Sequence, residues 1–572
     1  MFADQFIQIA TLLPTDKMYG FGENIHQTLK HDFTKYKTWS MFARDEATES
    51  YVENTKNLYG VHPFYMMLET DGKAHGVLIL NSNAQDVTTG PGPHLVYRTI
   101  GGLLDIYFFP GPSPTDVVKQ YQSLIGKPFM PAYWSLGFQL SGYGYEYVDE
   151  FKKVVEKNLE KKVPLEEWRF IRGFAEELHK RNMKIILTFD PAISMTSTSF
   201  RRAFLTNVSF IEYADKSLVQ KEVNNNYTLT NDTKIMLGVA WPDNHVAFPD
   251  FSDPLNQTRK WWIKEHQRFR KMIPYDGIWI DMNEPAVFGT NVDHPWYFDT
   301  EGHPKITPLR CDKFSDPYER YEKPPYQTQA VYRFNSSLLL SQNTLCMTGT
   351  THRGKQILYN SKNLYGLYET MATYEAAKNA TGKRPVVISR STFPGSGHYA
   401  GHWLGENNST WSDLRTSIIG VQEFNIFGLP YVGSDICGFT GNTEEELCLR
   451  WQQTGAFHSL SRNHDDKGSL PQDPAEWESV TNATIQANLF RYSYLSYLYS
   501  LHFDAALNGG TVIRPVFFEF PENSETHDLG LQFMWGDSLM IAPVYEKGKE
   551  EVDVYLPPSS TWYSLRENDY GA

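Results

Sequence analysis

The sequence predicts an α/β protein in which a parallel sheet with covering helices lies between two β-rich ends. From Pro131 onward, short apolar runs alternate with stretches of helical spacing, which is the pattern of a parallel α/β architecture. Residues 1 to about 130, and those after about 508, hold short apolar runs between turn residues instead. The 572 residues are enough for about two to four domains.

The two ends are predicted to be β-structure because their apolar runs are short and bounded by turns. Residues 64–68 and 76–80 are two such runs, and Asp and Gly lie between them. Residues 538–544 show the same pattern near the C-terminus.

The middle part begins with an expected strand at 135–139, followed by expected helices at about 146–160 and 165–181. Further strands are expected at 185–190 and 385–390, and the alternation continues into the 430s and 450s. The apolar residues at helical spacing are Val148, Phe151, Val155 and Leu159 in the first helix and Trp168, Ile171, Phe174 and Leu178 in the second.

One place breaks this alternation. Only residues 161–164 join the two helices, although a strict β/α order would place a strand there. One strand of the sheet is therefore expected to be missing. Its neighbours would each keep unpaired backbone groups, at a cost of about 1–3 kcal/mol for each buried group.

The stretch from Gly277 to Glu284 is the strongest indication of a functional site. An apolar run leads directly into Asp281, Asn283 and Glu284. This pattern is typical of a buried parallel strand whose carboxyl end opens into a polar pocket, where (β/α)-barrels place their chemistry. The alternative, which is the commoner one for such a run alone, is a strand followed by a charged loop.

Charge and hydropathy exclude some classes of function. The chain has 53 basic and 67 acidic residues, a net charge of −14, which disfavours nucleic acid as a partner. No run of about 18 apolar residues exists, so no membrane span is expected in this chain. Aromatic residues make up 15% of the sequence, which suits either large cores or a groove that stacks on sugar rings.

Cysteines and glycosylation sequons indicate an oxidising compartment. The four cysteines are Cys311, Cys346, Cys437 and Cys448, an even number that permits two disulfides without establishing them. The first residues lack the basic and apolar regions of a signal peptide, so we expect the N-terminus of this chain to be incomplete. The asparagines in sequons are Asn207, Asn226, Asn231, Asn256, Asn335, Asn379, Asn407, Asn408 and Asn482.

An ordered set of motifs over nearly the whole chain resembles glycoside hydrolase family 31, the retaining α-glucosidases. A single Asp-Pro-Ala would be a weak signal, but the ordered set is very specific. The motifs occupy residues 19–23, 97–102, 131–138, 190–194, 248–251, 279–284, 389–393, 402–405, 435–439 and 462–464.

The resemblance implies a (β/α)8 TIM barrel, here with one strand missing, flanked by β domains. The barrel would span 131–507 with an insert at about 194–250, after an N-terminal β-sandwich at 1–130 and before a C-terminal β domain at 508–572. The implied reaction removes terminal, non-reducing α-linked glucose from maltose and malto-oligosaccharides, without metal or organic cofactor. The implied location is the secretory pathway, either extracellular or lumenal, with membrane association only through segments absent from this chain.

Retaining hydrolysis of a glycosidic bond needs two carboxyl groups about 5–5.5 Å apart, one as nucleophile and one as acid/base. The resemblance implies that Asp281 is the nucleophile. The alternative is that its carboxylate only caps a helix. The family's acid/base is an aspartate, but this chain has Glu406 at that position, which places the same group on an arm one methylene longer.

The remaining site residues also follow from the resemblance. Arg390 would lie between the two carboxylates, with a structural ion pair as the alternative. Asp435 and His464 would hydrogen-bond the sugar, and a core histidine is the alternative for the latter. Trp241, Trp279, Trp403 and Phe439 would form the aromatic wall, or pack in the core. The other implied site residues are Tyr143 on the pocket floor, Asp45 from the sandwich, Met282, the supporting Glu284 and Asp190, and a rim disulfide between Cys437 and Cys448. Cys311 and Cys346 could pair in the loop after the fourth strand.

The missing strand keeps a second function open. In the family that strand supplies an aspartate to the sugar, and this chain lacks it as well as the acid/base aspartate. The alternative to an active α-glucosidase is therefore an impaired or inactive relative that at most binds carbohydrate. If the protein were an extracellular scaffold with no sugar role, the match of the family's site residues would be a coincidence. Those residues are Asp281, Arg390, Asp435 and His464.

Overall fold

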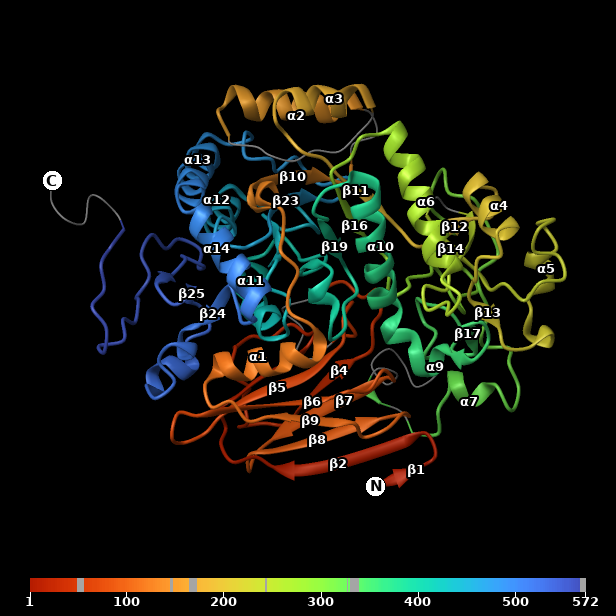
Figure 1. The fold of residues 1–572 in the computed structure, drawn as a ribbon, viewed down its shortest axis with the longest axis horizontal. Helices are drawn as coiled ribbons and strands as arrows, with labels where there is room; N and C mark the ends of the chain where they lie inside the picture. The colour runs from red at the N-terminus through yellow and green to blue at the C-terminus, as the bar shows by residue number, and fades with distance from the viewer. Residues whose placement is uncertain are drawn as a thin grey trace.

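The computed structural model describes residues 1–48, 56–144, 148–163, 172–241, 244–326, 328–329 and 339–565. Two antiparallel sheets, β1-β2-β8-β7-β4 and β3-β5-β6-β9, form the predicted sandwich at one end of the molecule (Figure 1). Their strands are β1 (Phe2–Ala3), β2 (Phe6–Leu12), β3 (Met18–Gly22), β4 (Lys37–Met41), β5 (His62–Leu68), β6 (Ala74–Ile79), β7 (Gln85–Gly90), β8 (His94–Thr99) and β9 (Ile106–Phe109).

The sandwich forms because each sheet turns an apolar face inward. In β8, Leu95, Tyr97 and Thr99 are buried, while the residues between them are partly exposed. This period of two is what a sheet covered on one face requires. Side chains from both sheets, such as Met67 of β5 and Val87 of β7, share one core.

A parallel sheet forms the centre of the middle part. It has the order β11-β16-β19-β20-β21, and a second parallel sheet has the order β10-β23-β22. Only Ser434 separates β21 from β22, so the two sheets continue into each other there. The strands are β10 (Phe138–Gly142), β11 (Ile186–Phe189), β16 (Gly277–Ile280), β19 (Val387–Ser389), β20 (Gly401–Trp403), β21 (Val432–Gly433), β22 (Asp435–Ile436) and β23 (Ser461–Asp465).

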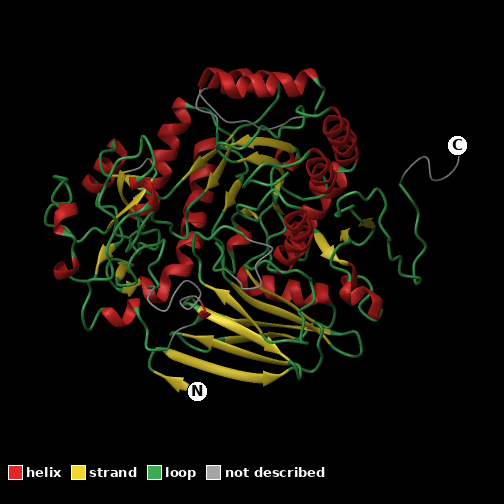
Figure 2. Ribbon diagram, turned by 180° about the vertical axis from the view of Figure 1, so that it is seen from behind, coloured by secondary structure: helices red, strands yellow, loops and turns green. Residues whose placement is uncertain are grey.

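The predicted gap in the barrel lies between β10 and β11. In the described part of the chain these two strands do not pair with each other, and only α2 (Val148–Glu160) and α3 (Arg172–Lys180) lie between them. The start of the second expected helix, with Trp168 and Ile171, falls at 164–171, outside the described residues. Figures 1 and 2 show both helices at the end of the molecule opposite the sandwich.

The expected strand at 135–139 begins later than predicted. Tyr133–Leu136 forms a 3-10 turn, and β10 starts at Phe138. Ser135 causes the difference, because its backbone N–H and its hydroxyl both donate to the carbonyl of Ala132, at 3.0 and 2.7 Å. A local hydrogen bond of this kind competes with strand pairing.

Helices cover the parallel sheet. α6 and α10 pack against each other, and α10 also packs on β16 and β19. The indole N–H of Trp262 in α6 donates to Thr373 in α10 at 2.9 Å. In the described chain no helix is both long and apolar enough to cross a membrane. Apart from α2 and α3, the helices in the described residues are α1 (Pro114–Ile125), α4 (Thr198–Leu205), α5 (Lys221–Asn224), α6 (Gln257–Met272), α7 (Glu319–Glu322), α9 (Leu358–Ser361), α10 (Tyr365–Thr381), α11 (Trp411–Ile426), α12 (Glu445–Gly455), α13 (Glu478–Ser493) and α14 (Leu495–Asn508).

Three small antiparallel sheets complete the fold. Two of them, β12-β15-β14 and β13-β17-β18, lie beside the barrel, and the third, β24-β25-β26, is C-terminal. Tyr19 of β3 stacks on Phe517 at 4.2 Å and donates to the carbonyl of His527 at 2.9 Å, so the sandwich and the C-terminal part share one core. The strands are β12 (Ile193–Ser194), β13 (Glu212–Tyr213), β14 (Leu237–Ala240), β15 (Asn244–Ala247), β17 (Gly349–Thr351), β18 (Gln356–Ile357), β24 (Ile513–Pro515), β25 (Phe533–Trp535) and β26 (Leu539–Ile541).

A buried arginine holds together β10, which borders the gap, and β23, its neighbour on the other side. Arg491 of α13 donates to the carbonyls of Leu136 at 2.7 Å, Ala456 at 2.6 Å and Ser459 at 2.9 Å. These carbonyls precede β10 and β23 in the chain. One guanidinium therefore fixes the beginnings of two adjacent strands.

Replacing this arginine is expected to destabilise the barrel strongly. Arg491→Leu leaves several buried carbonyls without donors, at about 1–3 kcal/mol for each, so we expect a loss of about 3 kcal/mol or more. Thermal unfolding measures it, with the exposed Arg201→Leu as the control, which should change little. Equal melting temperatures for the two variants would contradict this role of Arg491.

Candidate active site

The predicted polar residues gather at the carboxyl edge of the parallel strands. Asp281 directly follows β16, Arg390 directly follows β19, and Glu406 comes shortly after β20. Asp435 begins β22, and His464 lies in β23. Because parallel strands present their carboxyl ends at the same edge, residues far apart in the sequence meet there.

Arg390 is the centre of this group. Its Nε lies 3.1 Å from Asp281 Oδ1, and its Nη1 lies 3.3 Å from Glu406 Oε1. Its Nη2 lies 2.9 Å from Glu284 Oε2 and 3.3 Å from Asp45 Oδ1. The arginine side chain is only 2% exposed, so these carboxylates supply the charge partners that a buried cation requires.

The carboxylates around Arg390 differ in their exposure to solvent. Glu284 is fully buried and accepts from Nε and Nη2 of Arg390, both at 2.9 Å, which makes a bidentate pair. Asp281, Asp45 and Glu406 are 21%, 27% and 34% exposed. A substrate can therefore reach these carboxylates but not Glu284, whose geometry is that of a structural support.

The environment of Glu406 favours its protonated form. Burial of the carboxyl group, followed by the negative charge of Asp45, raises the pKa of Glu406 to about 8, against the opposing charge of Arg390. The backbone N–H of Glu406 donates to the Tyr59 hydroxyl at 3.3 Å, and Thr48 donates to its carbonyl at 2.8 Å. The sandwich thus holds the segment that carries Glu406.

An aromatic wall lies beside the carboxylates. The ring of Trp279 lies 5.0 Å from Trp403 and 5.3 Å from His464, and Phe439 stacks on His464 at 5.0 Å. The guanidinium of Arg462 covers Trp279 at 4.3 Å. The structure thereby brings four of the predicted binding residues into one cluster.

Asp435 presents one carboxylate oxygen that none of the described protein groups satisfies. Arg462 donates to Oδ1 at 2.5 and 3.1 Å, whereas Oδ2 has no hydrogen-bond partner among the described residues. Burial raises the pKa of Asp435 to about 6, although Arg462 opposes that rise. A buried acceptor without a donor suits a ligand hydroxyl.

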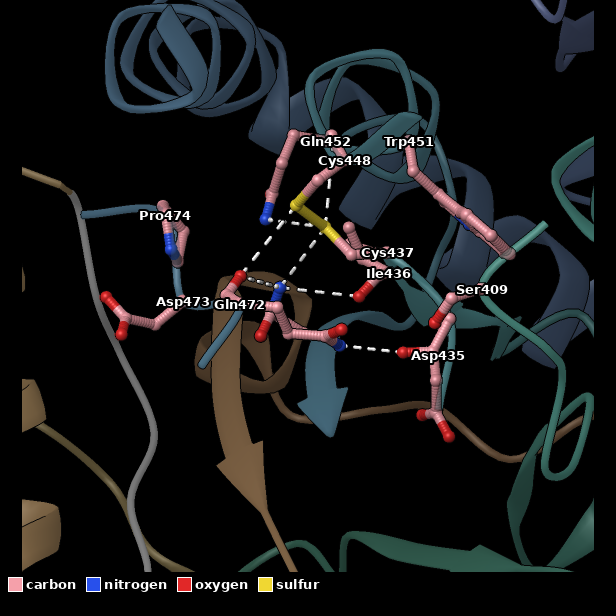
Figure 3. The surroundings of a disulfide bond; sticks show 12 residues. Ser409, Asp435, Ile436, Cys437, Cys448, Trp451, Gln452, Gln472, Asp473 and Pro474 are labelled. Atoms are coloured by element: carbon pink, nitrogen blue, oxygen red, sulfur yellow. Dashed lines mark hydrogen bonds between the residues drawn. A yellow bond between two sulfur atoms is a disulfide. The ribbon is translucent and has the colours of Figure 1, made fainter. Parts of the chain in front are cut away.

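A disulfide supports this side of the site, as Figure 3 shows. Cys437 and Cys448 are bonded, and Asn463 donates to the sulfur of Cys437 at 3.5 Å. Gln472 donates to the carbonyls of Gly438 and His464, at 2.7 and 3.0 Å. The disulfide expected between Cys437 and Cys448 is therefore present. A second disulfide joins Cys311 to Cys346, the pairing that the sequence left open.

The other predicted residues lie around this cluster. The rings of Tyr143 and Trp241 are 6.5 Å apart. Met282 has a left-handed backbone with φ of 55°, and its N–H donates to Asp281 Oδ1 at 2.7 Å. Burial raises the pKa of Glu369 in α10 well above its usual value, and the negative charge of Asp190 raises it further.

Sequence reasoning missed several residues of the site. Tyr59 places its ring 4.7 Å from the Arg390 guanidinium carbon, and no local pattern near Tyr59 indicates this contact. Arg462 lies within the motif at 462–464, but its ion pair with Asp435 was not foreseen. Both contacts link residues from different strands or domains, and only the fold brings such residues together.

Comparisons with known proteins agree with this architecture. Three family models match: the glycosyl hydrolases family 31 TIM-barrel domain at residues 128–501, the family 31 C-terminal domain at 509–572 and the family 31 N-terminal galactose mutarotase-like domain at 4–87. A human probable maltase-glucoamylase 2 is 39% identical over 98% of this chain and 23% of its own length. A rat lysosomal alpha-glucosidase is 40% identical over 99% of this chain and 56% of its own length.

Solved structures show the same fold. The crystal structure of a Tris-bound glucosidase II alpha subunit superposes with a TM-score of 0.77 at 22% identity, over 96% of this chain and 57% of that one.

This chain spans about a quarter to three fifths of the length of the curated relatives it matches. With the barrel model matching residues 128–501 of the 572, the chain belongs to glycosyl hydrolase family 31.

Proposed function

We propose that this protein is a retaining α-glucosidase that releases glucose from the non-reducing ends of maltose and malto-oligosaccharides. The observation that carries the proposal is the pair of substrate-accessible carboxylates, Asp281 and Glu406, held by one guanidinium in different environments. Glu406 has a raised pKa and can donate a proton at neutral pH. Retaining hydrolysis requires one carboxyl group as nucleophile and a second as acid/base.

The first half of the reaction forms a covalent intermediate. A carboxylate oxygen of Asp281 attacks the anomeric carbon, and the bond from that carbon to the leaving oxygen breaks. Glu406 gives its proton to the leaving oxygen, so the departing sugar leaves as an alcohol. Arg390 keeps both carboxylates in register through its contact with each.

The second half restores the enzyme. Glu406, now ionised, takes a proton from water as the water oxygen attacks the anomeric carbon. The bond to Asp281 breaks, and glucose leaves with its original anomeric configuration. Asp435 Oδ2 would accept from a hydroxyl of the bound glucose, and Trp279 and Trp403 would exclude bulk water.

A second candidate is a family member that binds sugar without turning it over. The observation that favours it is the open edge between β10 and β11 in the described residues. The longer arm of Glu406 also favours it, because a misplacement of about 1 Å can reduce a rate by on the order of a hundredfold. In this candidate the sugar-binding residues are present, but the two carboxyl groups are not placed correctly for the attack on the anomeric carbon.

The proposed location is the secretory pathway, either lumenal or extracellular. Two disulfides support it, since they persist in oxidising compartments. Asn407 cannot carry a glycan, because its side chain is buried and pairs with the backbone of Asp435. Asn335 lies outside the described residues. The exposed sequon asparagines are Asn207, Asn226, Asn231, Asn256, Asn379 and Asn482.

Asp281→Asn is expected to abolish turnover while leaving the fold intact. The amide is a poor nucleophile, and the change keeps the size of the side chain. Glucose release from maltose measures activity, and thermal unfolding checks the fold. The control is Asp16→Asn, at an exposed aspartate of the sandwich. Turnover retained by Asp281→Asn would refute the assignment, and a folded wild-type protein that releases no glucose would favour the second candidate.

The pH profile should report the acid. Because Glu406 works in its protonated form and has a pKa of about 8, kcat/KM for maltose should stay high up to about pH 8 and fall above it. Glu406→Gln should lower kcat/KM for maltose by about 10²–10⁴-fold. An aryl α-glucoside, whose phenolate leaves without a proton, should be affected much less. Equal losses on both substrates would argue against Glu406 as the acid.

A further inference from the structure

A buried lysine lies where the sandwich meets the barrel. Lys362 directly follows α9 and is only 1% exposed, and its Nζ lies 4.3 Å from the centre of the Phe42 ring. Burial, and then the charge of Arg44, lowers the pKa of Lys362 well below its usual value. The charges of Glu284 and Glu46 oppose this change. A buried amine is stable only where its N–H groups find acceptors, so the acceptors of Lys362 show what it holds together.

Its two acceptors belong to segments that carry carboxylates of the candidate site. Nζ of Lys362 donates to the carbonyl of Ala43 and to the carbonyl of Glu284, the latter at 3.3 Å. Ala43 lies two residues before Asp45 in the chain. The carboxylates of Asp45 and Glu284 both contact Arg390. The lysine therefore links, through the backbone, two segments whose side chains meet at one guanidinium.

The residue after the lysine holds the same segment of the sandwich. The backbone N–H of Ala43 donates to Oδ1 of Asn363 at 2.9 Å, and Nδ2 of Asn363 donates to the carbonyl of Asn83 at 3.2 Å. Both polar groups of the Ala43 backbone thus bind side chains that are consecutive in the sequence. Because only Arg44 separates Ala43 from Asp45, these two hydrogen bonds restrict where the Asp45 carboxylate can lie.

The position of Asp45 matters because its charge acts on Glu406. After burial, the negative charge of Asp45 is the largest influence that raises the pKa of Glu406. The charge of Arg390 lowers this pKa, and those of Asp281 and Asp466 raise it. The separation between Asp45 and Glu406 therefore helps to determine the pH at which the acid loses its proton.

We propose that Lys362, with its neighbour Asn363, is a positioning residue that holds Asp45 beside Arg390 and thereby sets the pH range in which Glu406 works as the acid. This inference rests on the proposed function and adds to it a residue that touches no substrate. Lys362 acts through the backbone of Ala43, and it takes no part in the bond-breaking step.

The direction of the pH effect separates this role from a direct effect of the lysine charge. Without its donors, the segment of Asp45 is less restricted, and the carboxylate turns towards solvent. The pKa of Glu406 then falls, so the decline of kcat/KM at high pH begins at lower pH. If the positive charge of Lys362 acted on Glu406 directly, its removal would raise that pKa and move the decline to higher pH.

The experiment measures kcat/KM for maltose as a function of pH. Lys362→Met keeps the apolar stem and removes the donors, and its high-pH decline should begin about 1 pH unit lower than in the wild type. Asn363→Ala frees the N–H of Ala43 and should move the decline in the same direction. It carries the test if thermal unfolding shows that Lys362→Met is not folded. The matched control is Lys355→Met, at an exposed lysine, which should leave the profile unchanged.

A double-mutant comparison identifies Asp45 as the intermediary. Asp45→Asn removes the charge itself, so its high-pH decline should already begin at lower pH. Adding Lys362→Met should move it no further, because two changes that act through one group are not additive. A decline that stays near pH 8 or moves to higher pH in Lys362→Met would overturn the proposal. An undiminished further shift in the Asp45→Asn background would overturn it as well.

Failure of the proposed function would be visible separately. If the folded wild-type protein releases no glucose, infrared difference spectroscopy replaces kinetics. The protonated carboxyl group of Glu406 is identified as the band that Glu406→Gln lacks, and its intensity is followed against pH. A lower midpoint pH in Lys362→Met than in the wild type would still support the positioning role. An unchanged or higher midpoint would overturn it.

Discussion

The site depends on the pairing of one buried cation with several carboxylates. Arg390 has almost no access to bulk water, so its charge must be matched within the protein. Its planar guanidinium offers donors in fixed directions, and its partners come from different pieces of chain. Asp281 follows β16, Glu406 follows β20, and Asp45 comes from the sandwich. Arg390 contacts all three and so links these parts of the chain. The sandwich is therefore part of the site.

The same cation lets similar groups do different work. Glu284 is enclosed and takes both strong hydrogen bonds, so it neutralises the arginine without meeting a substrate. Asp281 and Glu406 each receive one contact and remain partly exposed. Burial and the charge of Asp45 then raise the pKa of Glu406. Position around a single guanidinium thus gives these carboxylates different environments, which is what the proposed roles of nucleophile and acid require.

Local patterns in the sequence predict the elements, but not the contacts between distant ones. The step from an apolar run into Asp281 placed that residue at a strand end. The alternation predicted a gap before β11, and in the described residues β10 and β11 do not pair with each other. The start of β10 was misplaced because Ser135 bonds to Ala132. Tyr59 carries no local signal, because its role depends on the charge of Arg390 beside its ring, and only chain folding brings the two together.

Asp281 alone, among the carboxylates around Arg390, is expected to form a bond to sugar, and trapping that bond is the most direct test. An activated glucosyl fluoride with a second fluorine on the sugar ring slows hydrolysis of such an intermediate and so lets it accumulate. Mass spectrometry of the intact protein and of its peptides then locates the sugar. We predict one fluoroglucosyl group per chain, on Asp281. A label on Glu284, Glu406 or Asp45, or a folded protein that acquires no label, would contradict this assignment.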